Sequence, residues 1–257
     1  MIDGVPEVDS GQLPIGGDPA PLGLVPAPWS VAFAFALVAL AFVLTLGAGA
    51  LAVAVGATGW APIVRALGIG GILLGLYVAI LGVIWATSTT RGVGFAEAVG
   101  LERTVAPYWY AVAVGASLGG WLLSVAYTAM LTALGVKLPR EDLALFRLMP
   151  GGAIGAAIMV ALLIVVVPFA EEVVYRGVVL PAFGARWGTG AAVAVSALVF
   201  SAVHVSAVGF LPLLVVGAIL GWLFVASRSL RVAILAHAVF NALGVAVLLA
   251  SHASEIL

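Results

Sequence analysis

The chain has 257 residues, of which 64% are hydrophobic and 8% are charged, and its formal net charge is −1. A soluble domain carries about 25% charged residues, so most of the surface of this protein must face lipid rather than water. The near-neutral charge gives no electrostatic case for nucleic acid or another anionic partner, and the lack of cysteine excludes disulfides, thiolate metal sites and a cysteine nucleophile.

The first 28 residues differ in composition from the rest of the chain. They contain four acidic residues and six prolines, and they have neither the basic start nor the apolar stretch of a signal peptide. This composition predicts a disordered acidic tail over residues 1–28 and no cleavable signal peptide.

Seven segments of the remaining chain are long and apolar enough to cross a bilayer, which takes about 20 mainly apolar residues. They are 29–55, 67–87, 108–134, 153 to about 174, 191–208, 211–226 and 232–249. An eighth helix would arise if the first segment divides near Gly47 and Gly49. We therefore expect an all-α polytopic membrane bundle of about seven to eight transmembrane helices.

The segments between these spans carry most of the charge. Residues 141–149 have the helical apolar spacing of a segment that lies in the membrane interface. Lysine and arginine in alternate loops number six on one side and four on the other when Arg176 is included, which weakly favours a cytoplasmic N-terminus.

One short motif resembles a hydrolase signature but lies in the wrong context. Residues 115–119 read GASLG and match the G-x-S-x-G nucleophile elbow. That elbow requires a strand, a turn and a helix, whereas these residues lie inside a continuous apolar segment. We expect them to serve helix packing.

Few ionisable residues remain at membrane depth, where one costs about 2.5–3.5 kcal/mol on insertion scales. Glu172 and Arg176 are four residues apart, so they share a helix face and can pair. Glu171 points about 100° away and is left free for proton chemistry as a general base. The alternative is a helix end at the interface, whose charges simply reach water.

Two later segments add polar groups. His204 is a lone histidine, which more often packs or forms a structural hydrogen bond than takes part in catalysis. His237 and Asn241 share a helix face and could donate together to an oxyanion, or could form an interhelical hydrogen bond. Taken together with the glutamates, these groups suffice for a hydrolase that activates water.

Three motifs in this order, EEVVYR (171–176), FSAVH (200–204) and HAVFN (237–241), resemble the signature of the CPBP intramembrane proteases. This family includes the type II CAAX prenyl proteases and bacterial Abi-like proteins. The resemblance covers about residues 150–250. It divides the chain into the tail 1–28, N-terminal transmembrane helices 29–149, a catalytic core 150–250 and a C-terminal tail 251–257.

The resemblance implies an endopeptidase that cuts a membrane-associated substrate, of which prenylated CAAX proteins are one option. Glu171 would activate water with the help of His204, and His237 and Asn241 would bind the oxyanion. Glu172 and Arg176 would position these groups. The partners would be a membrane-anchored protein or peptide and the lipid bilayer, and the location a bacterial cell membrane.

Several alternatives stay open at this stage. We favour catalysis without a cofactor, although Glu171, His204 and His237 could bind zinc and leave a position for water. A metalloprotease would then result. The chain could also be a non-catalytic scaffold or immunity-type protein, or a proton-coupled carrier that uses Glu171 and His204 as a relay.

Overall fold

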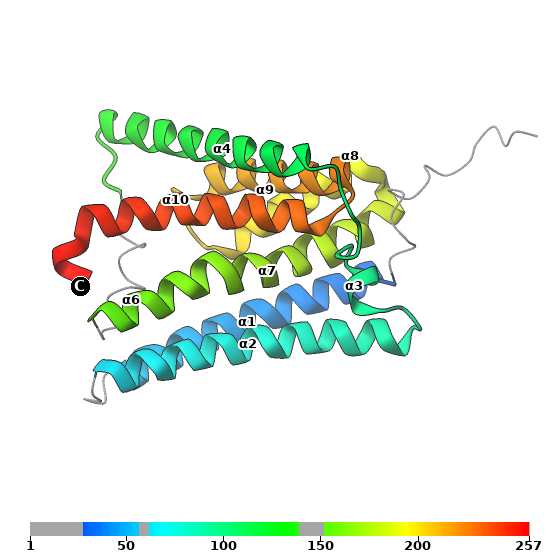
Figure 1. Ribbon diagram of the computed structural model, residues 1–257, viewed down its shortest axis with the longest axis horizontal. Helices are drawn as coiled ribbons and strands as arrows, with labels where there is room; N and C mark the ends of the chain where they lie inside the picture. The colour runs from blue at the N-terminus through cyan, green and yellow to red at the C-terminus, as the bar shows by residue number, and fades with distance from the viewer. Residues whose placement is uncertain (1–27, 57–61, 139–151, 257) are drawn as a thin grey trace, which may run out of the picture.

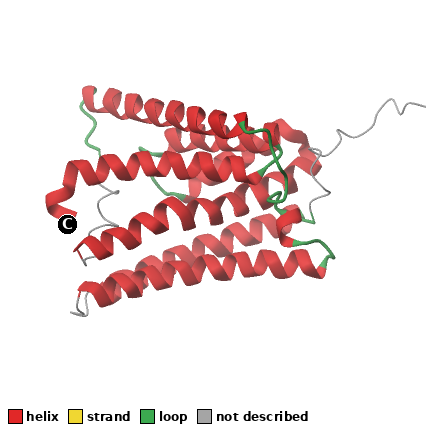
Figure 2. Ribbon diagram, viewed as in Figure 1, coloured by secondary structure: helices red, strands yellow, loops and turns green. Residues whose placement is uncertain are grey.

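The computed structural model describes residues 28–56, 62–138 and 152–256 (Figure 1). Within these ranges the regular structure is helical and contains no strand (Figure 2). The all-α architecture expected from composition is therefore confirmed. The predicted acidic tail, apart from Pro28, and the predicted interfacial helix 141–149 lie outside the described residues.

The long helices lie side by side along the longest axis of the molecule (Figure 1). In chain order the elements are α1 (Val31–Gly56), α2 (Pro62–Thr90), α3 (Phe95–Ala98), α4 (Tyr108–Ala133), α6 (Gly152–Ala161), the π-helix η1 (Leu162–Val166), α7 (Val167–Glu172), the π-helix η2 (Val173–Val179), α8 (Leu180–Val203), α9 (Phe210–Ser227) and α10 (Leu230–Ile256).

Six described segments have the length and composition of membrane spans, and the longest of them is Ile154–Val203, with 50 residues. A straight helix of that length would extend about 75 Å, far more than the hydrocarbon core of about 30 Å. Gly188 lies within α8 with φ 80° and ψ 170°, which no helical residue adopts, so the chain bends there. The bend divides this segment into two helical runs, which correspond to the predicted spans 153 to about 174 and 191–208.

The alternative of an eighth helix is wrong. α1 runs without interruption through Gly47 and Gly49. Inside a bilayer every backbone polar group needs an internal partner, so an exposed break at these glycines would cost more than a continuous helix. At the other end of the chain, α10 continues to Ile256, well into the predicted C-terminal tail.

The fourth span extends further than the predicted end near residue 174. All residues of η2, Val173–Val179, are buried inside the bundle, and the helical run continues into α8. A Cβ atom at Gly177 would lie 2.9 Å from the Cβ atom of Val99, so glycine allows η2 to approach the chain after α3. Because Arg176 is buried, the charge bias between the two sides falls to five against four and favours neither orientation.

Candidate active site

A buried ion-pair network joins α7, η2, α9 and α10. The Arg176 Nη1 atom donates to Glu172 Oε1 at 2.7 Å, and both side chains are fully buried. The Nη2 atom of Arg176 donates to the carbonyl of Gly217 at 2.9 Å. The pairing expected from the four-residue spacing is therefore present, and the idea that these two charges reach water at a helix end is wrong.

His237 completes this network from α10. Its Nδ1 atom lies 2.8 Å from the same Glu172 Oε1 that accepts from Arg176. An ionised carboxylate only accepts, so Nδ1 carries the proton of this bond. Glu172 thereby fixes the orientation of the imidazole ring, with Nε2 directed toward Glu171, whose Oε2 atom is 3.9 Å away.

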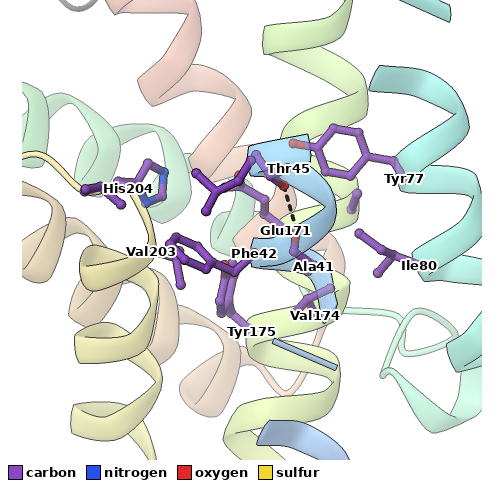
Figure 3. Close-up of a pocket in the computed structure, with 13 residues that line it drawn as sticks. Ala41, Phe42, Thr45, Tyr77, Ile80, Glu171, Val174, Tyr175, Val203 and His204 are labelled. Atoms are coloured by element: carbon purple, nitrogen blue, oxygen red, sulfur yellow. Dashed lines mark hydrogen bonds between the residues drawn. The ribbon is translucent and has the colours of Figure 1, made fainter. Parts of the chain in front are cut away.

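Glu171 has a different environment from its neighbour. Its side chain is 18% exposed, and its Oε2 atom is buried without a hydrogen-bond partner among the described residues. Glu171 borders two cavities of about 340 and 440 Å³. The smaller one is drawn in Figure 3, where Glu171 lies between the side chains of α2 and the end of α8. The carboxylate is thus free to act on a molecule in either cavity.

His204 also borders both cavities. It caps α8, and Val205 directly after it adopts a φ of 50°, which reverses the chain. The Nδ1 atom of His204 lies 2.6 Å from the carbonyl of Phe200. A carbonyl only accepts, so Nδ1 carries the proton, and Nε2 of the neutral ring is left as an acceptor.

The helical run that leads to His204 is short. From Gly188 to the end of α8 at Val203 there are 15 residues after the bend, or about 22 Å of helix. The turn after α8, which contains His204 and Val205, lines the smaller cavity. The helix therefore ends five residues before the predicted end of the fifth span, 191–208.

Asn241 lines the larger cavity and is partly engaged by the backbone. Its Nδ2 atom donates to the carbonyl of Leu163 at 2.9 Å. In η1 the N–H of Val167 bonds to the carbonyl of Leu162 five residues earlier, and the next such donor would be Pro168, which has no N–H. Asn241 supplies the missing donor and keeps its second N–H and its oxygen for other partners.

One family model matches the part of the chain that holds these groups. Residues 153–243 match the model described as type II CAAX prenyl endopeptidase Rce1-like. This part of the chain is similar to the Rce1-like family, and residues 153–243 are called the Rce1-like segment below. No curated protein and no solved structure matches the chain significantly.

The Rce1-like segment contains all six residues singled out in the sequence, and the structure brings five of them around one site. Four of them border the larger cavity: Glu171, His204, His237 and Asn241. The fifth, Glu172, bonds to the Nδ1 atom of His237. The sixth, Arg176, lines neither cavity and bonds to Glu172. The guanidinium also lies 4.8 Å above the ring of Phe200.

The expected zinc ligands do not form a metal cluster. Among the described residues there is no group of three histidine, cysteine, aspartate or glutamate side chains able to hold a metal ion. Glu171 and His237 approach each other, and each histidine keeps its Nε2 atom for a further partner, since Nδ1 of His204 lies near the Phe200 carbonyl and that of His237 bonds to Glu172. Glu171, His204 and His237 do not, however, converge on one point as three metal ligands in this arrangement.

The G-x-S-x-G motif is not part of the site. It lies within α4, and the Ser117 hydroxyl bonds to the carbonyls of Ala113 and Ala236 at 2.7 and 2.6 Å. The serine joins α4 to α10, which agrees with the packing role expected from its context.

The sequence did not point to the cavity-lining residues that lie outside the Rce1-like segment. Thr45 of α1 and Tyr77 of α2 border both cavities. Neither is ionisable at neutral pH, so a list of charged residues at membrane depth omits them. A polar aromatic residue at the centre of the second apolar span was the available signal for Tyr77.

Proposed function

We propose that this protein is an intramembrane endopeptidase of the glutamate type. The observation that carries the proposal is the Oε2 atom of Glu171, which has no partner among the described residues and lies where two cavities meet, with His204 bordering the same two cavities. Both residues lie within the Rce1-like segment. A base and a second acceptor next to the same space are the groups needed to hold and deprotonate one water molecule.

In the proposed reaction, water donates one hydrogen bond to Glu171 and the other to His204 Nε2. Its oxygen attacks the carbonyl carbon of the scissile peptide bond while Glu171 takes the proton. The tetrahedral intermediate carries an oxyanion. When it collapses, the C–N bond breaks and the leaving amine takes the proton from Glu171, so the carboxylate is regenerated without a covalent acyl-enzyme.

His237 and Asn241 are proposed to stabilise the oxyanion. Asn241 has one N–H left after its bond to Leu163. Since Nδ1 of His237 donates to Glu172, its Nε2 atom donates only when the ring carries both protons. In that form the charges of Glu171, Glu172, Arg176 and His237 sum to zero, and preorganised donors of this kind are worth about 10²–10³ in rate each.

The proposed substrate is a membrane-associated protein or peptide, with prenylated CAAX-type chains as one case. Support comes from the family description and from the larger cavity, which is lined mainly by aliphatic and aromatic side chains of α2, α6, η1, α9 and α10. Such a cavity suits an apolar part of the substrate.

Two other functions would use the same residues differently. A carrier would move protons or a solute through Glu171 and His204, and a scaffold would bind a partner without chemistry. The polar groups converge on two cavities beside a free carboxylate, which favours catalysis over a purely structural role.

The test is cleavage by the purified full-length protein in detergent of a peptide panel, half of it prenylated. We expect cleavage by the wild type and by Glu97→Gln, an exposed glutamate on α3, but none by Glu171→Gln. Addition of a chelator should leave the rate unchanged, and loss of activity with recovery on zinc would contradict the glutamate-type mechanism. Proton transport that depends on Glu171 without any cleavage would favour the carrier.

A further inference from the structure

The free atom of Glu171 poses a problem for its proposed role. Its Oε2 atom is buried and has no hydrogen-bond partner among the described residues. The nearest ionic group is His237 Nε2 at 3.9 Å, which is too far for a hydrogen bond. A carboxylate oxygen without a donor is not held in one orientation, whereas a general base must be positioned within hydrogen-bond reach of the water that it deprotonates. A donor for this oxygen is therefore needed.

Three polar side chains of the described residues border both cavities together with Glu171: Thr45, Tyr77 and His204. Tyr175 and Asn241 each border only one of the two cavities. Among the three that border both, one donor is uncommitted. The Thr45 hydroxyl donates to the carbonyl of Ala41 at 2.8 Å. His204 has its Nδ1 proton on the Phe200 carbonyl, and its neutral Nε2 only accepts.

Tyr77 is the group that remains. In Figure 3 the Tyr77 side chain extends from α2, and its hydroxyl group points toward the space beside Thr45 and Glu171. His204 lies on the opposite side of the cavity. No hydrogen bond of the Tyr77 hydroxyl is found within the described part of the chain. Tyr77 lies outside residues 153–243, so nothing in the family match assigns it a role.

We propose that Tyr77 is a positioning residue for Glu171: the Tyr77 hydroxyl donates a hydrogen bond to Glu171 Oε2 through one water molecule in the cavity. The bond holds the carboxylate in one orientation and turns its other oxygen toward the water that is to be activated. The consequence for catalysis rests on the function proposed above, whereas the interaction with Glu171 does not.

The test leaves the other polar groups near Glu171 unchanged. They are His237 from α10, His204 after α8, and Glu172, Tyr175 and Arg176 on its own helical run. Replacing Tyr77 by phenylalanine removes one oxygen atom and leaves the ring and these groups in place. Tyr127→Phe on α4 is the matched control because Tyr127 borders neither cavity.

The first experiment is the pH–rate profile of peptide cleavage by the purified full-length protein. For Tyr77→Phe we expect kcat to fall about tenfold, KM to change little, and the acidic limb of the profile to move upward by about one pH unit. Tyr127→Phe should match the wild type. A Tyr77→Phe profile that coincides with the wild type would overturn the proposal, since a purely packing role of the ring predicts that result.

The second experiment does not depend on activity. The infrared C=O stretch of the protonated Glu171 carboxyl group is identified by its loss in Glu171→Gln and followed against pH. Its midpoint should move upward in Tyr77→Phe and stay in place in Tyr127→Phe, and an unmoved midpoint in Tyr77→Phe overturns the proposal. Cleavage that persists in Glu171→Gln would instead refute the proposed function and leave the infrared result to decide the role of Tyr77.

Discussion

At the scale of single residues, the two adjacent glutamates have opposite environments. Glu172 is fully buried and accepts from Arg176 and His237 through one oxygen. Glu171 lies on another face of the same helix and borders two cavities. A carboxylate fixed between two donors stabilises the structure, whereas one beside open space is available for chemistry.

This difference predicts separate effects on stability and activity. Glu172→Gln leaves the buried Arg176 without its counter-charge, and breaking a buried pair in this way costs about 3–5 kcal/mol. Thermal unfolding in detergent, followed by tryptophan fluorescence, should show a clearly lower midpoint for Glu172→Gln and a midpoint near that of the wild type for Glu171→Gln. Equal midpoints for the two variants would contradict the assignment of the ion pair as structural.

The proposed role of His204 gives a kinetic prediction. Without the acceptor Nε2, water in the cavity loses one of its two orienting partners, so His204→Ala should lower kcat by about 10²–10³ while KM and the unfolding midpoint change little. His252→Ala serves as the control, because residue 252 lies in the last turns of α10 and belongs to none of the three sequence motifs. A His204→Ala variant with a normal kcat would show that the residue only packs.

Some of the residue contacts could be read from the sequence and others could not. The pair of Glu172 and Arg176 follows from helical spacing alone. The bond between His237 and Glu172 depends on how α10 lies against α7, which spacing within a helix does not reveal. The bond of Asn241 to Leu163 depends on a π-turn before Pro168, and Tyr77 came to light only once α2 was placed beside Glu171.

At the scale of the elements, two π-turns bracket the glutamates. η1 precedes α7 and η2 follows it, and π-turns are frequent at functional sites because they shift the side chains that follow. The apolar pattern predicted the spans but placed the end of the fourth one near residue 174. The apolar pattern could not show that η2 lies inside the bundle, because η2 is buried by contacts with other helices, among them α1, α8 and α10.

The contact between η2 and the chain after α3 gives a prediction at this scale. Gly177→Ala would bring a Cβ atom within 2.9 Å of Val99, so one of the two segments must move. We expect a lower unfolding midpoint and, because Arg176 is adjacent, reduced cleavage. Gly119→Ala on α4, where a Cβ atom meets nothing within 4 Å, should be neutral or slightly stabilising, as alanine favours helices. Equal midpoints would contradict the close packing of η2.

At the scale of the whole molecule, the bend at Gly188 decides the topology. With seven crossings, Arg91 after α2 and Arg228 after α9 lie on the same side of the membrane. With one crossing over Ile154–Val203 they would lie on opposite sides. The chain has no cysteine, so Arg91→Cys and Arg228→Cys each carry a single thiol. In oriented vesicles, a membrane-impermeant thiol reagent should label both from the same side. Labelling from opposite sides would contradict the bend.

The N-terminal helices and the Rce1-like segment build the cavities together. α1 and α2 contribute Thr45 and Tyr77, whereas the proposed base and its helpers come from residues 153–243. The sequence motifs identified the residues of the Rce1-like segment. Thr45 and Tyr77 were identified only from the packing of α1 and α2 against that segment. The proposed catalysis therefore needs α1 and α2 as well as the matched segment.

The most direct test of this account is the rate at which the protein, reconstituted in lipid vesicles, cuts a membrane-anchored peptide when only Glu171 is changed. We predict that Glu171→Gln lowers the rate by at least about 10³-fold, that Glu97→Gln retains the wild-type rate, and that both variants unfold at the wild-type temperature. Cleavage by Glu171→Gln within tenfold of the wild type would contradict Glu171 as the base that activates water.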